Sequence, residues 1–387
     1  MASLNDQRRE RVELIGKVGE LAGGPVIVYF TADSPIVTGL ISEDAPRPMF
    51  DHLQRMGRQK RIVLYLYSPG GQMETPWKIV TMMREFCDEL YVVIPYKAHS
   101  AATMIAIGCD KICMTSKAEL GPIDPSLMLA VPQEGAGNRL PDLGVEDVSG
   151  YLAFMRERAR LTDQAAIASV LLPLARHLTP PVLGRLERTY SHIRLVARNL
   201  LSLHKPPFED RQIGTITEAL TEKMYAHGHG IGRREAKQVG LDIQALDEGQ
   251  ERPVWSLYEL YEPVFRLQET RDLESYFPAG SDTYESSDTP VACIESTALL
   301  HAFVGKVRAQ RIRRIPPNPT INVNLGLQIP PGVSPQQLPQ AIQQAIQQLL
   351  QQGAQQINQA VSQALQSQSP IIGYSGSCVG GRWLRTT

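Results

Sequence analysis

Along the first 115 residues, short continuous apolar runs alternate with segments in which apolar residues recur every three or four positions. Four runs rich in β-branched and aromatic residues predict strands, at residues 24–30, 61–68, 90–95 and 111–115. Four segments predict helices, at residues 5–21, 47–57, 73–87 and 100–108. The run at 61–68 is apolar without interruption, which is typical of a strand buried on both faces. This alternation of strand and helix predicts an α/β fold with a parallel sheet and right-handed crossovers.

The pattern changes near residue 145. Residues 149–204 are strongly helical in spacing, with a break at the Thr-Pro-Pro of 179–181. Another helical stretch leads into residues 229–243, where Gly240 ends a helix before a short apolar segment. The acidic, Ser-rich residues 272–290 predict a linker or surface loop. A last strand is expected at 291–297 and a helix over 298–312.

The C-terminal part has a different composition, because nearly half of residues 336–368 are Gln. Its apolar residues recur every three, four or seven positions: Ile342, Ile346, Leu350, Ile357, Val361 and Leu365. This pattern fits either an amphipathic helix that self-associates or a low-complexity tail with transient helicity. Gly353 weakens the helical interpretation. Residues 369–387 are expected to lack regular structure.

These changes of pattern predict four regions. They are the first part of an α/β core at 1–148, a helical insertion at 149–210, the remainder of the core with a linker at 211–315, and the Gln-rich tail at 316–387.

Composition narrows the possible partners. The 387 residues are 43% hydrophobic and carry a formal net charge of −1, which gives no overall attraction to nucleic acid or anionic membranes. The five cysteines form no CxxC pair or Cys/His cluster, so neither a metal nor another cofactor is expected. The N-terminus lacks the apolar core of a signal peptide, and no segment reaches the roughly 18 apolar residues of a membrane span. A cytoplasmic protein with reduced thiols and no membrane span is therefore expected.

Two short stretches suggest a catalytic site. Gly70 and Gly71 follow the strand at 61–68, where the backbone turns sharply without a Cβ in the way. Ser100 opens an apolar helix, whose first N–H groups are unpaired donors. A substrate carbonyl could lie between the Ser100 hydroxyl and the amides of Ala101 and Gly71, or Gly70. The alternative is an ordinary tight turn and a serine that caps its helix.

Three segments, taken in their order along the chain, resemble a known family. They are "YLYSPGGQMETPWKIVTMMRE" from residue 65, "VVIPYKAHSAATMIAIGCDKICMTSKAELGPIDPSL" from residue 92, and "HGHGIGRREAKQVGLDI" at 227–243. They resemble the serine dehydrogenase proteinase family, which belongs to the Clp-protease/crotonase superfamily and is related to signal peptide peptidase A. The resemblance extends over roughly residues 5–260. It implies a crotonase-like core, self-assembly, a Ser100 nucleophile and an oxyanion hole around Gly70, Gly71 and Ala101. One departure is Ala102, where relatives commonly have Gly.

The general base is less evident. Clp proteases carry a His about 25 residues after the serine, but Asp124 stands near that place here. Signal peptide peptidases use a downstream Lys, but this chain has no Lys between Lys117 and Lys205. Our first candidate is His227, with Asp124 orienting it or simply pinning a bend before Pro125. The alternative bases are His229, Lys223, Lys117 and Lys97.

These features predict a serine peptidase that forms an acyl-enzyme on Ser100 and cleaves peptides or unfolded protein segments. The protein would be a homo-oligomer that binds no nucleic acid. Two alternatives stay open: a catalytically inactive assembly scaffold that kept the fold, and acyl-CoA chemistry with Glu119 or Asp124 as the acid/base. The scaffold is suggested by the missing His near residue 125 and the missing mid-chain Lys.

Overall fold

The structure, a computed structural model, describes residues 2–34, 36–123, 180–221, 229–268, 272–314 and 339–386, with short pieces between 126 and 172. Residue contacts divide the chain into two compact units. The first comprises Met1–Arg271, Ser286–Val307 and Ser377–Thr387, and the second comprises Asp272–Glu285 and Arg308–Gly376. The division into four regions at 1–148, 149–210, 211–315 and 316–387 stays a prediction.

A parallel sheet organises the first unit. Its five parallel strands are β1 (Val26–Thr31), β2 (Gln59–Tyr67), β3 (Cys87–Ile94), β5 (Lys111–Met114) and β10 (Ile243–Ala245). The sheet continues through β11 (Thr283–Glu295), β12 (Leu300–Arg313) and β13 (Ile371–Thr386), in the order β10-β5-β3-β2-β1-β11-β12-β13. β11 pairs antiparallel with β1. The predicted α/β fold with a parallel core is confirmed.

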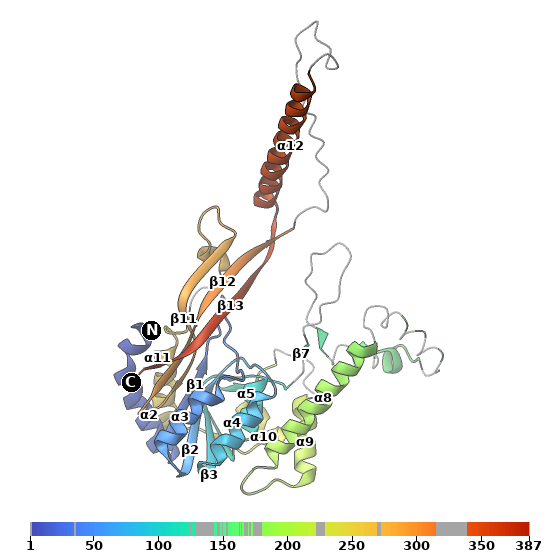
Figure 1. Ribbon diagram of the computed structural model, residues 1–387. Coiled ribbons are helices and arrows are strands. Elements are labelled where there is room, and N and C mark those ends of the chain that lie inside the picture. The colour runs from blue at the N-terminus through green and yellow to red at the C-terminus, as the bar shows by residue number, and fades with distance from the viewer. Residues whose placement is uncertain are drawn as a thin grey trace. The chain divides into compact units, whose positions relative to one another are not determined.

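Helices cover both faces of this sheet (Figure 1). One face packs against α3 (Pro46–Met56), α4 (Thr75–Arg84), α5 (Ala101–Ile107), α8 (Pro180–Leu201) and α9 (Asp210–Thr221). The other face packs against α2 (Arg8–Ala22) and α11 (Glu248–Tyr261). Ile62, Leu64 and Leu66 of β2 point to the first face, while Val63, Tyr65 and Tyr67 point to the second. The uninterrupted apolar run therefore reflects burial on both sides, as predicted.

A small second layer lies where the parallel strands end. It consists of β4 (Lys97–Ala98), β6 (Glu119–Leu120) and β9 (Ile231–Gly232), in the order β4-β6-β9. β4 and β6 are parallel, and β9 runs antiparallel to β6. The other elements among the described residues are α1 (Ala2–Asp6), β7 (Ser126–Leu127), β8 (Leu143–Gly144), the π-helical turn Phe154–Arg158, α10 (Arg233–Val239), the 3-10 turn Leu273–Tyr276 and α12 (Gln340–Gln368).

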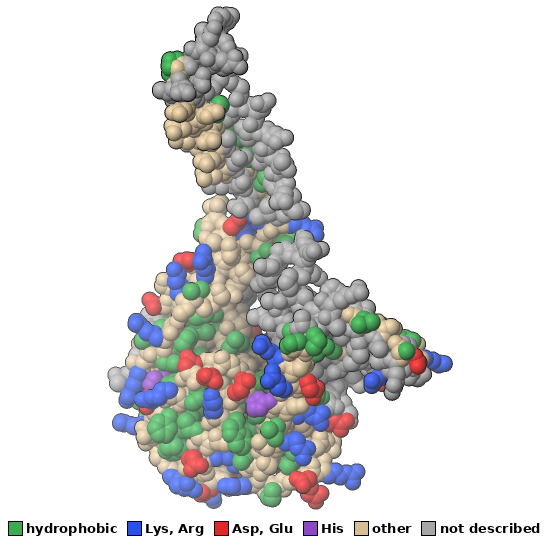
Figure 2. Space-filling model, turned by 45° about the vertical axis from the view of Figure 1, so that its right-hand side comes forward, with side chains coloured by type: hydrophobic (Ala, Val, Ile, Leu, Met, Phe, Trp, Pro, Cys, Tyr) green, Lys and Arg blue, Asp and Glu red, His purple; other side chains and the backbone are tan. Residues whose placement is uncertain are grey.

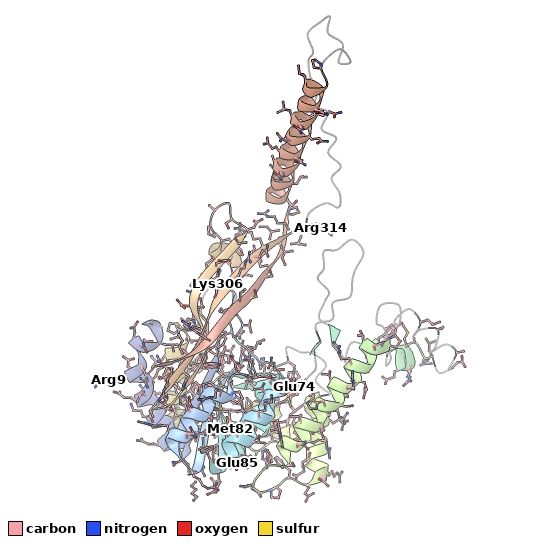
Figure 3. The ribbon with its side chains drawn as sticks, viewed as in Figure 1. Arg9, Glu74, Met82, Glu85, Lys306 and Arg314 are labelled. Carbon is pink, nitrogen blue, oxygen red and sulfur yellow. The ribbon has the colours of Figure 1, made fainter. Side chains whose placement is uncertain are left out.

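Three expectations for the C-terminal third are wrong. Residues 298–312 form strand β12 instead of a helix, and from Gly305 to Gln310 their side chains alternate between buried and exposed. Figure 3 shows Lys306 projecting from this strand. The expected linker at 272–290 already contains the start of β11, and the last residues form β13 instead of lacking structure.

The second unit, taken by itself, is held by polar contacts. Arg313 donates through Nε and Nη2 to the Asp282 carboxylate, at 2.7 and 2.8 Å. Arg311 Nε and the Tyr374 hydroxyl both donate to the Glu274 carboxylate, at 3.2 and 2.8 Å. The Gln-rich segment of this unit is the helix α12, the first of the two interpretations of its sequence.

Candidate active site

A glycine turn follows β2 at the carboxyl edge of the sheet. The Ser68 hydroxyl accepts a hydrogen bond from Gly70 N–H at 3.1 Å and one from the Thr31 hydroxyl at 2.9 Å. On the other side of the turn, Ile41 N–H donates to Gly70 O at 2.8 Å. Gly70 and Gly71 have φ of +124° and +155°, and a Cβ on Gly71 would lie 2.2 Å from Ile41 O. Only glycine fits both positions.

Ser100 lies against this turn in a strained conformation. Its φ of 52° and ψ of −115° are rare for a residue with a side chain. A Cβ on Gly70 would come within 2.9 Å of Ser100 Cβ, so the two segments touch directly. Ser100 stands at the N-cap of α5, but its side chain makes no capping hydrogen bond. The ordinary explanation for a serine at this place, an N-cap, is therefore not met.

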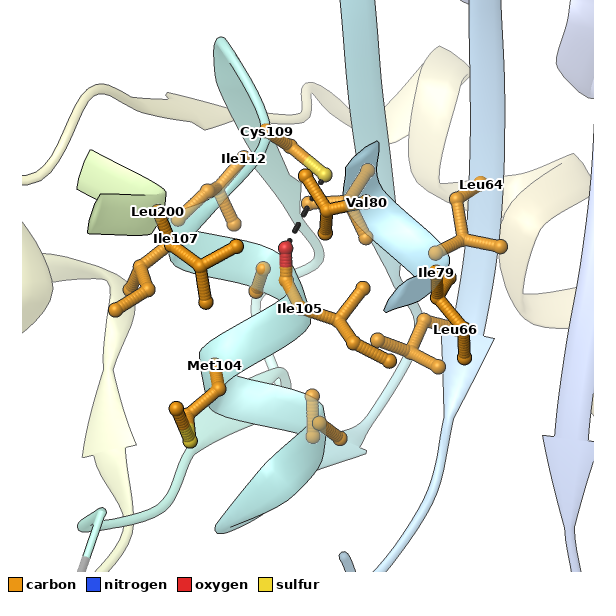
Figure 4. Packing of buried hydrophobic residues seen from close by; sticks show 14 of the residues in the cluster. Leu64, Leu66, Ile79, Val80, Met104, Ile105, Ile107, Cys109, Ile112 and Leu200 are labelled. Carbon is orange, nitrogen blue, oxygen red and sulfur yellow. Dashed lines mark hydrogen bonds between the residues drawn. The ribbon is translucent and has the colours of Figure 1, made fainter. Parts of the chain in front are cut away.

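A rigid support lies behind Ser100. Every residue of α5, from Ala101 to Ile107, is buried. Figure 4 shows the packing of Met104, Ile105 and Ile107 among the side chains of neighbouring elements, with the Cys109 thiol donating to Ile105 O at 3.4 Å. A helix that is buried on all sides is fixed by its packing, so the position of Ser100 is fixed too.

Two backbone donors at this site are free. Gly70 N–H is occupied by Ser68, as described above. Within the described residues, neither Gly71 N–H nor Ala101 N–H has a hydrogen-bond acceptor. The sequence left Gly70 and Gly71 as alternative donors, and this pattern favours Gly71. Two N–H groups beside a serine hydroxyl are the arrangement that stabilises an oxyanion.

The Ser100 hydroxyl has a weak partner. It donates to the Met73 thioether, with Oγ 3.7 Å from Sδ. No histidine, lysine or carboxylate of the described residues is hydrogen-bonded to Ser100 Oγ. The described hydrogen bonds therefore do not identify the general base.

The candidate bases have different surroundings. Lys97 Nζ forms an ion pair with Asp33 at 3.0 Å, and Lys117 Nζ lies over the Tyr96 ring at 4.7 Å. His229 Nε2 lies 2.9 Å from Glu235 and is exposed. The structure thus gives these three side chains partners other than Ser100. Asp124, Lys223 and His227 lie outside the described residues.

The sequence did not single out a pair formed by His99 and Glu119. His99 Nε2 lies 3.1 Å from Glu119 Oε1, directly beside the nucleophile position. Burial lowers the pKa of His99, with the positive charge of Lys97 adding to the effect and Glu119 opposing it. The pair could have been predicted from the parallel pairing of β4 with β6, which places residue 97 opposite residue 119 and so brings His99 near Glu119.

The thiols and the possible metal ligands offer no competing site in the described part of the chain. Burial raises the pKa of Cys87 and Cys113 to about 11, so these thiols stay protonated and poorly nucleophilic near neutral pH. Among the described residues, no cluster of three His, Cys, Asp or Glu side chains could hold a metal ion. No helix in that part of the chain is both long and apolar enough to cross a bilayer. On the face shown in Figure 2, basic and acidic side chains are interspersed.

Comparison with known proteins identifies the segment that carries this site. Residues 35–138 match the family model described as ClpP-like SDH-type serine proteinase. The predicted resemblance to the serine dehydrogenase proteinase family is confirmed. The matched segment includes the glycine turn, Ser100 and Glu119.

Two curated relatives are uncharacterized proteins of Methanocaldococcus jannaschii. One is 26% identical over 227 residues, covering 57% of this chain and 65% of the relative. The other is 22% identical over 200 residues, covering 52% of this chain and 56% of the relative. The chain thus spans less than two thirds of the length of either relative.

Solved structures of proteases are also similar. Two variants of the 1510-N membrane-bound stomatin-specific protease, one in complex with a substrate peptide, are 15% and 16% identical and align with TM-scores of 0.33. They cover 59% and 58% of this chain and 83% and 78% of their own. ClpP1 from Listeria monocytogenes is 13% identical, with a TM-score of 0.31 and coverage of 62% of this chain and 97% of its own.

Proposed function

We propose that this protein is a serine peptidase that cleaves peptide bonds through an acyl-enzyme on Ser100. The observation that carries the proposal is the geometry of Ser100. This residue is strained, makes no capping bond and lies beside two backbone donors that have no acceptor among the described residues. Backbone strain is retained where the surrounding structure enforces it, and such sites are commonly functional. The match of residues 35–138 to a serine proteinase family supports the same chemistry.

This geometry supports the following reaction. A base takes the Ser100 hydroxyl proton while Oγ attacks the substrate carbonyl carbon, and the carbonyl oxygen becomes an oxyanion between Gly71 N–H and Ala101 N–H. Each such donor contributes roughly 3–4 kcal/mol to the transition state. The tetrahedral intermediate then expels the amine, which takes the proton from the base. Water hydrolyses the resulting ester of Ser100 by the same steps.

His227 is our proposed base, with Asp124 orienting it, and Lys223 and His229 are the alternatives. Support comes from described residues next to the segments that hold them. Ile123 N–H donates to Leu220 O at 2.9 Å, so the chain enters both segments at neighbouring points. Three peptide units separate residue 227 from Gly230, which limits their Cα separation to about 11 Å. Gly230 in turn lies against Glu119, the partner of His99.

We further propose an extended peptide or unfolded segment as the substrate, a homo-oligomeric assembly and a cytoplasmic location. Helix α12 is a candidate for the assembly element, because its sequence carries an apolar stripe and no charged residue. Deletion of 318–387 tests this role by solution mass, although β13 is lost with the helix. A variant with Ile346, Ile357 and Val361 changed to Gln keeps β13 and is the matched test. An unchanged mass in that variant would exclude α12 as the assembly element.

A catalytically inactive scaffold is the second candidate, because the described partner of the Ser100 hydroxyl is a thioether instead of a base. Fluorophosphonate labelling, read by intact mass, separates the two functions. We expect one adduct on the wild type and none on Ser100→Ala. A folded wild type that takes no adduct in any assembly state would support the scaffold. Turnover of an acyl-CoA without labelling of Ser100 would favour the third alternative, for which Glu119 would have to leave His99.

A further inference from the structure

The Glu119 side chain joins two parts of the proposed site. One carboxylate oxygen, Oε1, accepts a hydrogen bond from His99 Nε2 at 3.1 Å. The other oxygen, Oε2, lies against Gly230, where a Cβ would come within 2.5 Å of it. The carboxylate therefore occupies the space that any side chain at residue 230 would need. Glu119 contacts both the residue before the nucleophile and the end of the segment that carries His227.

The backbone around Glu119 holds it at this junction. Glu119 is paired with Lys97 on one side and with Gly232 on the other. Its own N–H donates to Tyr96 O at 2.7 Å. A second glycine, Gly121, gives room to the His99 ring, because a Cβ there would come within 2.8 Å of His99 Cβ and Cγ. The histidine is thus confined by the glycine beside it and by the carboxylate at its far nitrogen.

The chemistry of the pair fixes the state of His99. An ionised carboxylate only accepts hydrogen bonds, so Nε2 carries the proton and Nδ1 is left as an acceptor. Burial and the neighbouring Lys97 lower the pKa of His99, which favours the neutral ring, while Glu119 opposes this shift. The side chains are about three-quarters and two-thirds buried, with 23% and 31% exposure, so water competes only partly for the bond.

We propose that Glu119 is a positioning residue, which ties Gly230 to the start of α5, where Ser100 stands, by holding His99. The proposal rests on the peptidase function, because it assigns a role within that same site. His99 and Ser100 are consecutive, so a rotation of the His99 peptide moves Ser100 Oγ, and a displacement of about 1 Å lowers the rate of such a reaction roughly 100-fold. Glu119 itself has no described hydrogen bond to the Ser100 hydroxyl or to the two donors.

Gly230, just before β9, and Gly232, in β9, give a matched test. Gly230→Ala drives a Cβ into the Glu119 carboxylate, whereas Gly232→Ala places its Cβ where nothing lies within 4 Å. Gly232 has a φ of −71° and a ψ of 167°, which alanine adopts without strain. We expect Gly230→Ala to slow fluorophosphonate labelling of Ser100 about 10- to 100-fold. Gly232→Ala should stay within about twofold of the wild type.

Substitutions of Glu119 separate positioning from simple packing. Glu119→Gln keeps an oxygen acceptor for His99 Nε2–H and should retain most of the labelling rate, whereas Glu119→Ala should slow it as Gly230→Ala does. If the glycine acts through the carboxylate, the double variant Glu119→Ala with Gly230→Ala should label no more slowly than Glu119→Ala alone. Thermal unfolding of each variant shows whether it is folded at the temperature at which the labelling rates are compared.

The outcomes distinguish the two ideas. A wild type that labels, with Gly230→Ala and Gly232→Ala equally fast, would overturn the role of Glu119 and leave the peptidase intact. Equal losses of labelling rate in Glu119→Gln and Glu119→Ala would also overturn the role of Glu119. These two variants test that role even if Gly230→Ala does not fold. A wild type that takes no label would instead defeat the peptidase function, and the positioning role with it.

Discussion

Two described serines that lie next to histidines, Ser296 and Ser100, differ in the properties that matter for catalysis. At the first, Ser296 Oγ lies 2.8 Å from His52 Nδ1, and His52 Nε2 lies 3.0 Å from His301 Nδ1. His301 Nε2 then approaches Asp51 at 3.5 Å. Because Ser296 Oγ accepts from Leu299 N–H, its own proton can go to His52, and every group in the row has a partner.

The second serine, Ser100, has no short hydrogen bond to a histidine among the described residues. Its backbone is strained, its hydroxyl meets only a thioether among the described residues, and the two amides beside it have no acceptor. Ser296, His52 and His301 are at most 4% exposed, whereas Ser100 is only partly buried. A row of short hydrogen bonds that is complete and closed to solvent stabilises a fold. A nucleophile instead needs access and unsatisfied donors for the charge that forms on the substrate.

The largest expected effect is a difference between alanine variants of the two serines. Ser100→Ala should abolish fluorophosphonate labelling, a loss of about 1,000-fold or more, because the nucleophile is gone. Ser296→Ala should label at close to the wild-type rate but unfold more readily, by about 1–3 kcal/mol, since it leaves buried His52 Nδ1 without its partner. Labelling kinetics and urea unfolding of both variants check this. Loss of labelling in Ser296→Ala with intact folding would reverse the assignment.

Gly70 tests whether the tight turn serves Ser100. At Gly70→Ala the new Cβ would lie 2.9 Å from Ser100 Cβ and 3.4 Å from Ser100 Oγ, so labelling should fall about 100-fold. Gly57→Ala is the matched control, because Gly57 also has positive φ, +70°, but a Cβ there meets nothing within 4 Å. Both variants carry a backbone penalty of about 1–3 kcal/mol, and only the first should lose labelling. Equal labelling of the two would show that the contact with Ser100 is unimportant.

The buried histidines predict an acid-sensitive fold. Burial lowers the pKa of His52 to about 3, with the charge of Arg385 and the proximity of His301 adding to the effect and Asp51 opposing it. Burial also lowers the pKa of His204 and His301. The unfolded chain, with histidine pKa values of about 6.5, binds more protons than the folded chain below that pH. Stability is therefore fully present above pH 6.5 and is lost as the pH falls toward 3, by on the order of 4 kcal/mol for His52 alone.

Urea unfolding between pH 7.5 and 4 measures this slope. His52→Gln should give a lower but flatter curve, because it removes one titrating ring. Ser296→Ala should lower the curve with little change of slope, since both rings remain. A wild-type stability that does not change across this range would contradict the effect, and with it the view of this cluster as a structural element that requires neutral rings.

The sequence predicts the parallel core well because local patterns determine it. Strand β2 is an uninterrupted apolar run bounded by a glycine turn, and the helices that cover the sheet have clear apolar spacing. The same local logic fails for β12 and β13, whose pairing joins residues far apart in the chain. A Cβ on Gly305 would meet Cys378 Sγ at 2.3 Å, and one on Gly381 would meet the Phe303 ring at 2.4 Å. Residues 305–310 of β12 do alternate between buried and exposed, but no local pattern reveals which distant strand packs against them.

In the candidate site, too, the sequence predicts the features set by local patterns and misses those set by contacts between distant residues. Gly70, Gly71 and Ser100 stand out in the sequence because turn and helix-start chemistry is local. The choice of Gly71 over Gly70 as the free donor depends on Ser68 and Thr31, whose contact across neighbouring strands no spacing rule reveals. The pair of His99 with Glu119 depends on the register of β4 against β6. The base depends on loops whose approach to Ser100 is set by the tertiary structure, and its identity stays a prediction.

The smallest expected effect concerns backbone strain. A side chain at the φ of 52° and ψ of −115° of Ser100 disfavours the folded state, by about 1–3 kcal/mol. Ser100→Gly should relieve this strain, and the greater freedom of glycine in the unfolded chain should offset part of the gain, which leaves a stabilisation of about 1 kcal/mol. Ser100→Ala keeps the Cβ and should leave stability nearly unchanged. Ser296→Gly should destabilise the fold, because it removes a satisfied buried hydroxyl. If Ser100→Gly were less stable than Ser100→Ala, the conformation at residue 100 would not be strained, and the two serines would differ in access and free donors alone.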